Sequence, residues 1–202
     1  MESVFGRTNR SLPPTWLKLE AGGLDRDQAL ELARYAVSKG APLDVTSSPS
    51  LWGVALRGHV AVLSVRGGFD IENAGSETHA FDLLSAHLVE TLSCLTVRTL
   101  DFYFLKLRRG LEEHQISGAI QALSAAKQDG LIRHSGFEAC GPAFAVLANW
   151  QFNDAFEAAI IPAGSENDPL YNLAKERRLG ILTPGENLHS VQTIADVDRA
   201  LG

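Results

Sequence analysis

Three charged side chains lie in or directly after apolar runs of the sequence and could meet in one cluster. Asp44 lies in the run 41–46, Arg66 follows the run 59–65, and Lys106 follows the run 100–105. If these runs are neighbouring strands, Arg66 or Lys106 could pair with Asp44. A charge cluster of this kind can shift a pKa and orient a catalytic acid. Two alternatives stay open: Asp44 caps a loop, or Arg66 or Lys106 faces solvent.

Other residues that could take part in catalysis or binding give weaker signals. Glu138 follows the run 131–137 and could pair with Lys106 or Arg66. Cys140 precedes Gly141 and Pro142, and because no nearby base is identifiable, an inert thiol is favoured. The six histidines are His59, His79, His87, His114, His134 and His189. None has metal-ligand spacing with another, so no metal site is predicted.

Short apolar runs alternate with segments of helical periodicity along most of the chain. Strands are predicted near 15–19, 42–46, 59–65, 99–105, 131–137, 156–161 and 179–183. Helices are predicted near 25–40, 84–95, 116–130, 142–150, 169–177 and 193–201. The alternation indicates a parallel sheet, either an open doubly wound sheet or a (β/α) barrel. No G-x-G-x-x-G follows the first strand, which disfavours the open dinucleotide-binding sheet.

Composition excludes several classes of protein. The 202 residues are 45% hydrophobic and 21% charged, as in ordinary globular domains. With 18 Lys and Arg against 24 Asp and Glu, the net charge is -6, so neither nucleic acid nor a membrane is an expected partner. No apolar run approaches the roughly 20 residues of a membrane span, and the polar N-terminus has no secretory pattern. Cys94 and Cys140 have no disulfide or zinc spacing, so a cytoplasmic location is expected.

Four passages, in this order, resemble segments of the aldo-keto reductase family. They are residues 27–40 followed by Leu43 and Asp44, the strand L-D-F-Y-F-L at 100–105, the helix and strand at 122–136, and those at 173–182. The resemblance implies a parallel (β/α) TIM-type barrel formed by one domain, residues 1–202, with its site at the C-terminal strand ends. The eighth strand is the element in question. Without it, an open edge would be covered by the last helix or by a second copy in a homodimer.

The resemblance also implies a set of catalytic positions. The family transfers a hydride from NADPH to a carbonyl, using a Tyr as acid, a Lys that lowers the pKa of that Tyr, an Asp paired with the Lys, and a His that orients the substrate. Of these four only the Asp has its counterpart, Asp44. Trp52 falls at the position of the Tyr, in a loop, Arg66 at that of the Lys, and Lys106 at that of the His. Because indole cannot donate a proton at neutral pH, Trp52 is predicted to be a packing residue.

The positions implied for the cofactor are changed as well. The Ser-Asn pair that holds the nicotinamide carboxamide falls at Glu138 and Ala139, where an acid would lose the donor and acceptor pair of the amide. The Gln of the sixth strand falls near Ile160, and the stacking aromatic falls near Thr183 and Pro184. After Pro184 only about 18 residues follow, with no Gly-rich or basic segment to hold a 2′-phosphate. No cofactor is therefore expected.

Two functional hypotheses follow from these changes. The first is a divergent aldo-keto reductase-like barrel that lacks standard NADPH-dependent carbonyl reduction and acts as a small-ligand binding or interaction barrel. The second is an NADPH-dependent oxidoreductase that reduces aldehydes or ketones, with Lys106 replacing the proton donor. In both hypotheses Asp44, Arg66 and Lys106 are the candidate site residues. Because the resemblance places all three at C-terminal strand ends, we expect Asp44 to form a salt bridge with Arg66 or Lys106, within about 4 Å. Saturable binding of the nicotinamide cofactor would favour the second.

Overall fold

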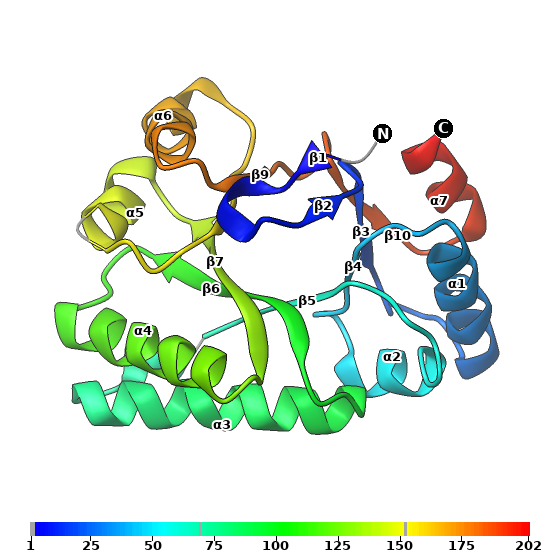
Figure 1. Ribbon diagram of the computed structural model, residues 1–202, viewed down its shortest axis with the longest axis horizontal. Coiled ribbons are helices and arrows are strands. Elements are labelled where there is room, and N and C mark those ends of the chain that lie inside the picture. The colour runs from blue at the N-terminus through cyan, green and yellow to red at the C-terminus, as the bar shows by residue number, and fades with distance from the viewer. Residues whose placement is uncertain (1–2, 69, 152) are drawn as a thin grey trace.

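The chain forms a ring of eight parallel strands surrounded by helices, as the computed structural model shows (Figure 1). The structure describes residues 3–68, 70–151 and 153–202. The barrel strands are β3 (Trp16–Leu19), β4 (Leu43–Asp44), β5 (Leu63–Gly67), β6 (Leu100–Arg108), β7 (Ile132–Cys140), β8 (Ala158–Ile160), β9 (Gly180–Leu182) and β10 (Leu188–Val191). They are hydrogen-bonded in the order β10-β3-β4-β5-β6-β7-β8-β9, and every pair is parallel. The prediction of a parallel TIM-type barrel is confirmed.

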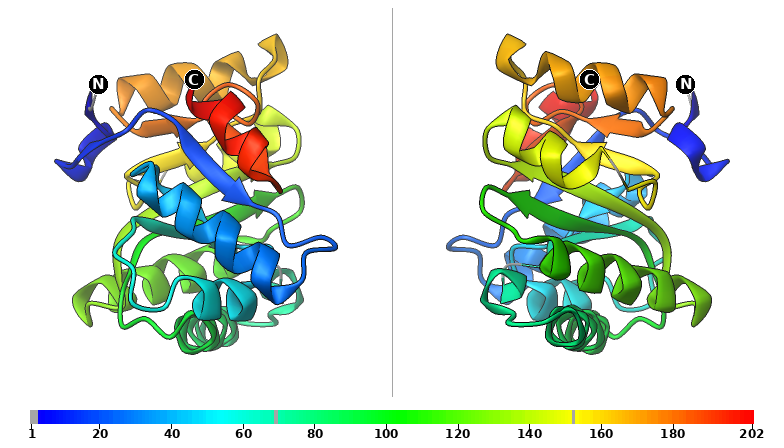
Figure 2. Two further views of the ribbon diagram at one scale, coloured as in Figure 1. Left: turned by 90° about the vertical axis from the view of Figure 1, so that its right-hand side faces the viewer. Right: turned by 90° about the vertical axis from the view of Figure 1, so that its left-hand side faces the viewer.

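Helices cover the outside of this ring, as the two side views in Figure 2 show. They are α1 (Arg26–Ser38), α2 (Pro49–Ala55), α3 (Glu77–Leu95), α4 (Glu113–Gln128), α5 (Ala143–Trp150), α6 (Asp168–Glu176) and α7 (Ile194–Leu201). Short 3-10 helices are η1 (Gly6–Thr8), η2 (Asp70–Asn73) and η3 (Ser165–Asn167). A hairpin of β1 (Ser3–Val4) and β2 (Ser11–Leu12) precedes the barrel, and its η1 segment contacts β8 and β9.

Local sequence signals explain where the first helix begins and ends. The side chain of Asp25 accepts a hydrogen bond from the amide of Gln28 at 2.8 Å, and the Gln28 side chain accepts one from the amide of Asp25 at 3.0 Å. This capping box satisfies two amides that the first turn leaves without partners. Gly40 ends the helix at a φ of +73°, a backbone conformation that disfavours other residues.

Large aromatic side chains fill the lower half of the lumen. Trp16, Phe102 and Phe104 are fully buried there, and we call these three residues the aromatic floor. The ring centroids of Trp16 and Phe102 are 5.1 Å apart, and Phe102 stacks on Phe104 at 6.0 Å. Gly136 makes room for this packing, because a Cβ atom there would lie 2.5 Å from the Phe104 ring. The floor is therefore a packed core that blocks the lumen at its N-terminal end.

The eighth strand, which the sequence left in question, is present as β10. Strand β10 pairs with β3 along all four of its residues, and a single bridge between Pro184 and Leu188 joins it to the β9 side. What this end lacks, within the described residues, is a helix between β9 and β10, since only residues 183–187 connect them. The open edge that suggested a homodimer is thus occupied, and the oligomeric state stays a prediction.

One predicted strand is shorter than expected, and two elements were not predicted. Strand β5 begins at Leu63 and ends at Gly67, so residues 59–62 of the predicted strand form a loop. The N-terminal hairpin and helix α2 were not predicted.

In the part of the chain that the structure describes, none of the helices has the length and apolar character that crossing a bilayer requires.

Candidate active site

Four charged residues project into the upper half of the lumen, directly above the aromatic floor. Successive strand residues point to opposite faces of the sheet, so Lys106 lies on the same face as Phe104, and Glu138 on the same face as Gly136. Asp44 ends β4, and Arg66 lies one residue before the end of β5. We call Asp44, Arg66, Lys106 and Glu138 the charged mouth, because they lie at the C-terminal strand ends where TIM barrels carry their sites.

Ion pairs connect all four residues of the charged mouth. Arg66 Nε donates to Asp44 Oδ2 at 2.6 Å, and Arg66 Nη1 donates to Glu138 Oε1 at 2.7 Å. Lys106 Nζ lies 3.6 Å from Glu138 Oε2. The predicted salt bridge of Asp44 is confirmed, with Arg66 as its partner, and so is the pairing of Glu138 with both Arg66 and Lys106. The alternative of solvent-facing side chains is excluded for Arg66, which is 8% exposed.

The backbone around Asp44 holds this arrangement in place. Asp44 Oδ1 accepts a hydrogen bond from the amide of Thr46 at 3.0 Å, and Thr46 Oγ1 accepts one from the amide of Arg66 at 2.9 Å. Burial opposes the charged form of Arg66, but Asp44 and Glu138 outweigh it and raise the pKa of Arg66 above its usual value. Arg66 is therefore a fixed cation. It cannot act as an acid.

Two polar atoms of the charged mouth are buried but have no hydrogen-bond partner among the described residues. They are Nη2 of Arg66, which is a donor, and Oε2 of Glu138, which is an acceptor and lies 3.6 Å from Lys106 Nζ. A buried polar group without a hydrogen bond is costly, so native proteins rarely keep one without a reason. This donor and this acceptor belong to residues that already pair with each other, and they can serve a ligand group that needs both.

Trp52 lies in helix α2, not in a loop as predicted, and it is fully buried. Its indole Nε1 donates to Ser47 Oγ at 3.2 Å. The Ser47 hydroxyl in turn donates to the carbonyl oxygen of Leu19 at 2.6 Å. Trp52 therefore fixes the loop after β4, and the prediction of a packing role is confirmed.

Cys140 is the last residue of β7, near Glu138 and Lys106. Burial and the neighbouring Glu138 raise the pKa of Cys140 to about 11. A thiol with that pKa is almost entirely protonated at neutral pH, so it is a poor nucleophile, as expected. Among the described residues, no group of three or more His, Cys, Asp or Glu side chains could hold a metal ion.

A second polar group at the C-terminal strand ends was missed in the sequence. Lys18 pairs with Glu20, and Ser190 Oγ donates to Glu20 Oε1 at 3.1 Å. Lys18 lies on the same face of β3 as Trp16, two residues further along, and in register with Asp44. Because Lys18 lies two residues after Trp16, the sequence could have indicated that the two side chains share one face of the strand. Only the pairing of β3 with β4 places Lys18 beside the charged mouth.

The N-terminus of α7 does not offer the phosphate site that a barrel of this type can place there. Thr193 Oγ1 accepts from the amide of Asp196 at 3.2 Å, and Asp196 Oδ2 accepts from the amides of Gln192 and Thr193 at 3.1 and 3.0 Å. These hydrogen bonds lower the pKa of Asp196. The carboxylate of Asp196 thus bonds the amides just before α7, so the chain itself supplies an anion at the start of this helix.

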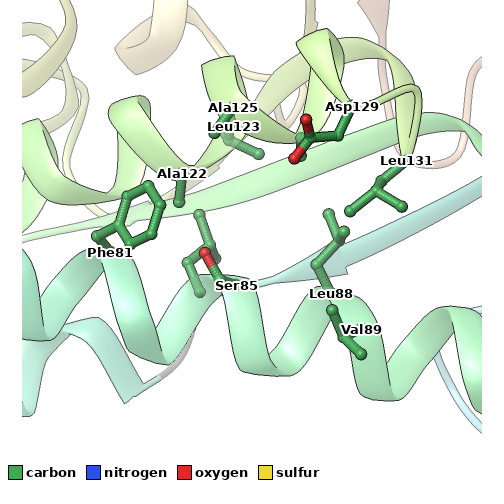
Figure 3. Close-up of a pocket in the computed structure, with 11 residues that line it drawn as sticks. Phe81, Ser85, Leu88, Val89, Ala122, Leu123, Ala125, Asp129 and Leu131 are labelled. Atoms are coloured by element: carbon green, nitrogen blue, oxygen red, sulfur yellow. The ribbon is translucent and has the colours of Figure 1, made fainter.

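A cavity of about 220 Å³ lies outside the barrel, between α3 and α4 (Figure 3). Its lining is apolar apart from Ser85 and Asp129, and Phe81 lies at the end opposite Asp129 in that view. No residue of the charged mouth lines it, so it is separate from the candidate site.

Comparisons with known proteins identify the fold. No family model matches the chain, and no curated protein sequence does. Among solved structures, an aldo-keto reductase from Bacillus halodurans has a TM-score of 0.74 and 16% identity over 92% of this chain and 65% of its own. A Pseudomonas aeruginosa protein named as an aldo-keto reductase has a TM-score of 0.75 and 18% identity over 100% of this chain and 92% of its own. The resemblance to aldo-keto reductases is thereby confirmed at the level of the fold.

A third similar structure corrects the expectation about cofactors. An aldo-keto reductase from Klebsiella pneumoniae, solved in complex with NADPH, has a TM-score of 0.70 and 18% identity over 89% of this chain and 65% of its own. The expectation that no cofactor takes part is wrong for this fold, because a barrel of the same architecture carries a nicotinamide cofactor. The chain spans about two thirds of the length of the Bacillus and Klebsiella proteins.

Proposed function

We propose that the charged mouth holds the nicotinamide end of NADPH and that the protein is an oxidoreductase acting on aldehydes or ketones. One observation carries the proposal: Arg66 Nη2 and Glu138 Oε2 are both buried and both lack a hydrogen bond. The structural neighbours support this hypothesis over a barrel that only binds ligands or partners, because they are aldo-keto reductases and one is solved with NADPH.

The two atoms fit a primary carboxamide. Such a group needs a donor for its oxygen and an acceptor for its NH₂, and Arg66 Nη2 and Glu138 Oε2 are one of each. From the sequence, an acid at position 138 loses the donor of the amide it replaces. In the structure Arg66, held 2.7 Å from Glu138, supplies that donor. Arg66 and Glu138 together therefore offer the donor and the acceptor that an amide side chain would provide, whereas neither residue offers both alone.

Lys106 is the residue that best supports proton chemistry. When bound, the cofactor supplies a hydride to the carbonyl carbon of the substrate. Lys106 Nζ carries three N–H donors and lies at the charged mouth beside Glu138, so it can donate a hydrogen bond and then a proton to the carbonyl oxygen. Its side chain is 15% exposed, which leaves a route for solvent to return the proton.

Charge balance at the charged mouth favours an uncharged substrate. Arg66 and Lys106 are two cations, and Asp44 and Glu138 are two carboxylates, so the four paired groups sum to zero. A charged substrate would add an unbalanced charge where solvent screening is weak. Asp44 is a positioning residue, because its contacts are with Arg66 and Thr46.

The test is NADPH-dependent reduction of an aromatic aldehyde by the wild-type chain and by Lys106→Met. Loss of one positioned proton donor lowers kcat by about 10²- to 10⁴-fold. Lys175→Met is the matched control, because Lys175 is an exposed lysine on α6, and its kcat should equal that of the wild type. The proposal is contradicted if the wild-type chain gives no turnover, or if Lys106→Met turns over at the wild-type rate.

A further inference from the structure

A cavity of about 400 Å³ lies at the N-terminal rim of the barrel, at the opposite end from the charged mouth. Arg10, which precedes β2, and Arg133, at the start of β7, both line it, together with Asp101 at the start of β6. The loop 59–62 before β5 forms another side. The volume is within the range of pockets that hold small molecules.

The polar side of this cavity has an excess of positive charge. Asp101 Oδ1 accepts from Arg10 Nη1 at 2.5 Å and from Arg133 Nη1 at 2.9 Å. Asp101 Oδ2 accepts from the amide of Leu63 at 3.0 Å. One carboxylate thus serves two guanidinium groups, which leaves a net charge of +1. In the described part of the chain, each guanidinium makes this one hydrogen bond, so further N–H groups of both arginines remain for an acceptor.

The remaining walls of the cavity are apolar except for His59 and Thr99. Val37, Val62 and Val97 line it, and so does Val60, which is 96% exposed. Helices α1 and α3 end beside this wall, and the carbonyl groups of a helix C-terminus disfavour an anion within the last turn. An anionic group is therefore favoured on the arginine side, and an uncharged apolar group on the valine side.

We propose that this rim cavity binds a small monocarboxylate whose remaining atoms are apolar. Arginine presents its N–H donors in a planar fork that matches the two oxygens of a carboxylate. A single negative charge balances the net charge of the Arg10, Asp101 and Arg133 group. The apolar part of the ligand covers Val60, which otherwise has almost its whole surface in water. This site is independent of the function proposed for the charged mouth.

The test is a titration of the isotope-labelled full chain with benzoate, followed by amide NMR shifts. Saturable shifts are expected at the amides of Leu63, Asp101 and residues 59–62. Arg133→Gln is expected to weaken benzoate binding about tenfold or more, because it removes a charge-assisted donor. Arg133 is 58% exposed, so this substitution is compatible with the fold, which the same spectra check. Arg199→Gln, which changes an exposed arginine on α7, is the matched control and should bind as the wild type does.

Two further ligands identify the chemistry that is recognised. Benzyl alcohol has a similar apolar group without the charge, and inorganic phosphate has charge without the apolar group, so both should bind more weakly than benzoate. The proposal is overturned if Arg133→Gln binds benzoate as tightly as the wild type. It is also overturned if benzyl alcohol or phosphate binds as tightly as benzoate, or if the shifts lie away from the rim.

Discussion

The lower half of the lumen is filled by the aromatic floor, while the upper half holds the charged mouth, with Lys106 two residues beyond Phe104 on β6. The floor contains one buried donor without a partner, the indole Nε1 of Trp16, and no charge. The mouth contains four charges and a buried donor and acceptor without hydrogen bonds. Packed rings stabilise a barrel, whereas unsatisfied ionic groups destabilise it by about 1–3 kcal/mol each. The difference indicates that stability is concentrated in the floor and ligand chemistry in the mouth.

Removing a ring from the floor should have the largest effect on stability. Phe104→Ala empties a fully buried site that contacts Phe102 and Trp16, so the free energy of unfolding should fall by about 3–5 kcal/mol. Urea denaturation followed by circular dichroism measures this change. Folded Phe104→Ala should still bind NADPH with wild-type affinity if the floor has no direct role in the site. A loss below about 1 kcal/mol would show that the floor is not the packed core described above.

Removing the central cation of the mouth should cost somewhat less stability but should abolish function. Arg66→Met leaves Asp44, which is 1% exposed, without its charged partner, and breaking a buried pair in this way costs about 3 kcal/mol. Adding Asp44→Leu removes the carboxylate that has lost its charged partner. The double variant should therefore regain part of that stability in urea denaturation. Neither variant should bind NADPH. If Arg66→Met were as stable as the wild type, the mouth would be a solvated cluster and not a buried one.

A smaller effect is expected from acid titration at the N-terminal rim. Burial alone would raise the pKa of Glu157, but hydrogen bonds with His134 (3.2 Å) and Lys127 (3.0 Å) outweigh it and keep the pKa below its usual value of 4.5. Because the pKa is lower in the folded chain, Glu157 contributes stability above the unfolded pKa that is lost as the pH falls through the folded value. The wild-type unfolding free energy should therefore fall more steeply with decreasing pH below about 5 than that of Glu157→Gln. Equal slopes would exclude this contribution.

The parts of the molecule that sequence predicted are those with local, periodic signals. The strands that carry Asp44, Arg66 and Lys106 are apolar runs between helices. The resemblance to aldo-keto reductases placed these residues at strand ends, which meet at one end of a barrel, so the ion pair with Asp44 could be predicted. Strand β10 was missed because only residues 183–187 separate it from β9, whereas parallel strands usually need a crossover of a dozen residues or more. The seven-residue helix α2 was missed because two turns are too short to show a clear helical period.

The chemistry of the mouth could not be read from the sequence in the same way. By residue type alone, Glu138 is an acceptor that lacks the N–H donor of the amide it replaces. That loss argued against a nicotinamide cofactor. Only the folded structure brings Arg66, 72 residues away in the chain, to within 2.7 Å and supplies the donor. Burial of the two unpaired atoms is likewise a property of the closed barrel and has no counterpart in any single segment.

The measurement that tests the central claim most directly is a fluorescence titration of the wild-type chain, Glu138→Met and Glu157→Met with NADPH. The account predicts saturable binding to the wild type and about tenfold weaker binding to Glu138→Met, which has no oxygen to accept the carboxamide NH₂. Glu157→Met, the same substitution at the opposite end of the barrel, should bind as the wild type does. Absence of saturable binding to the wild type, or equal affinity in Glu138→Met, would contradict the assignment of the charged mouth as a nicotinamide site.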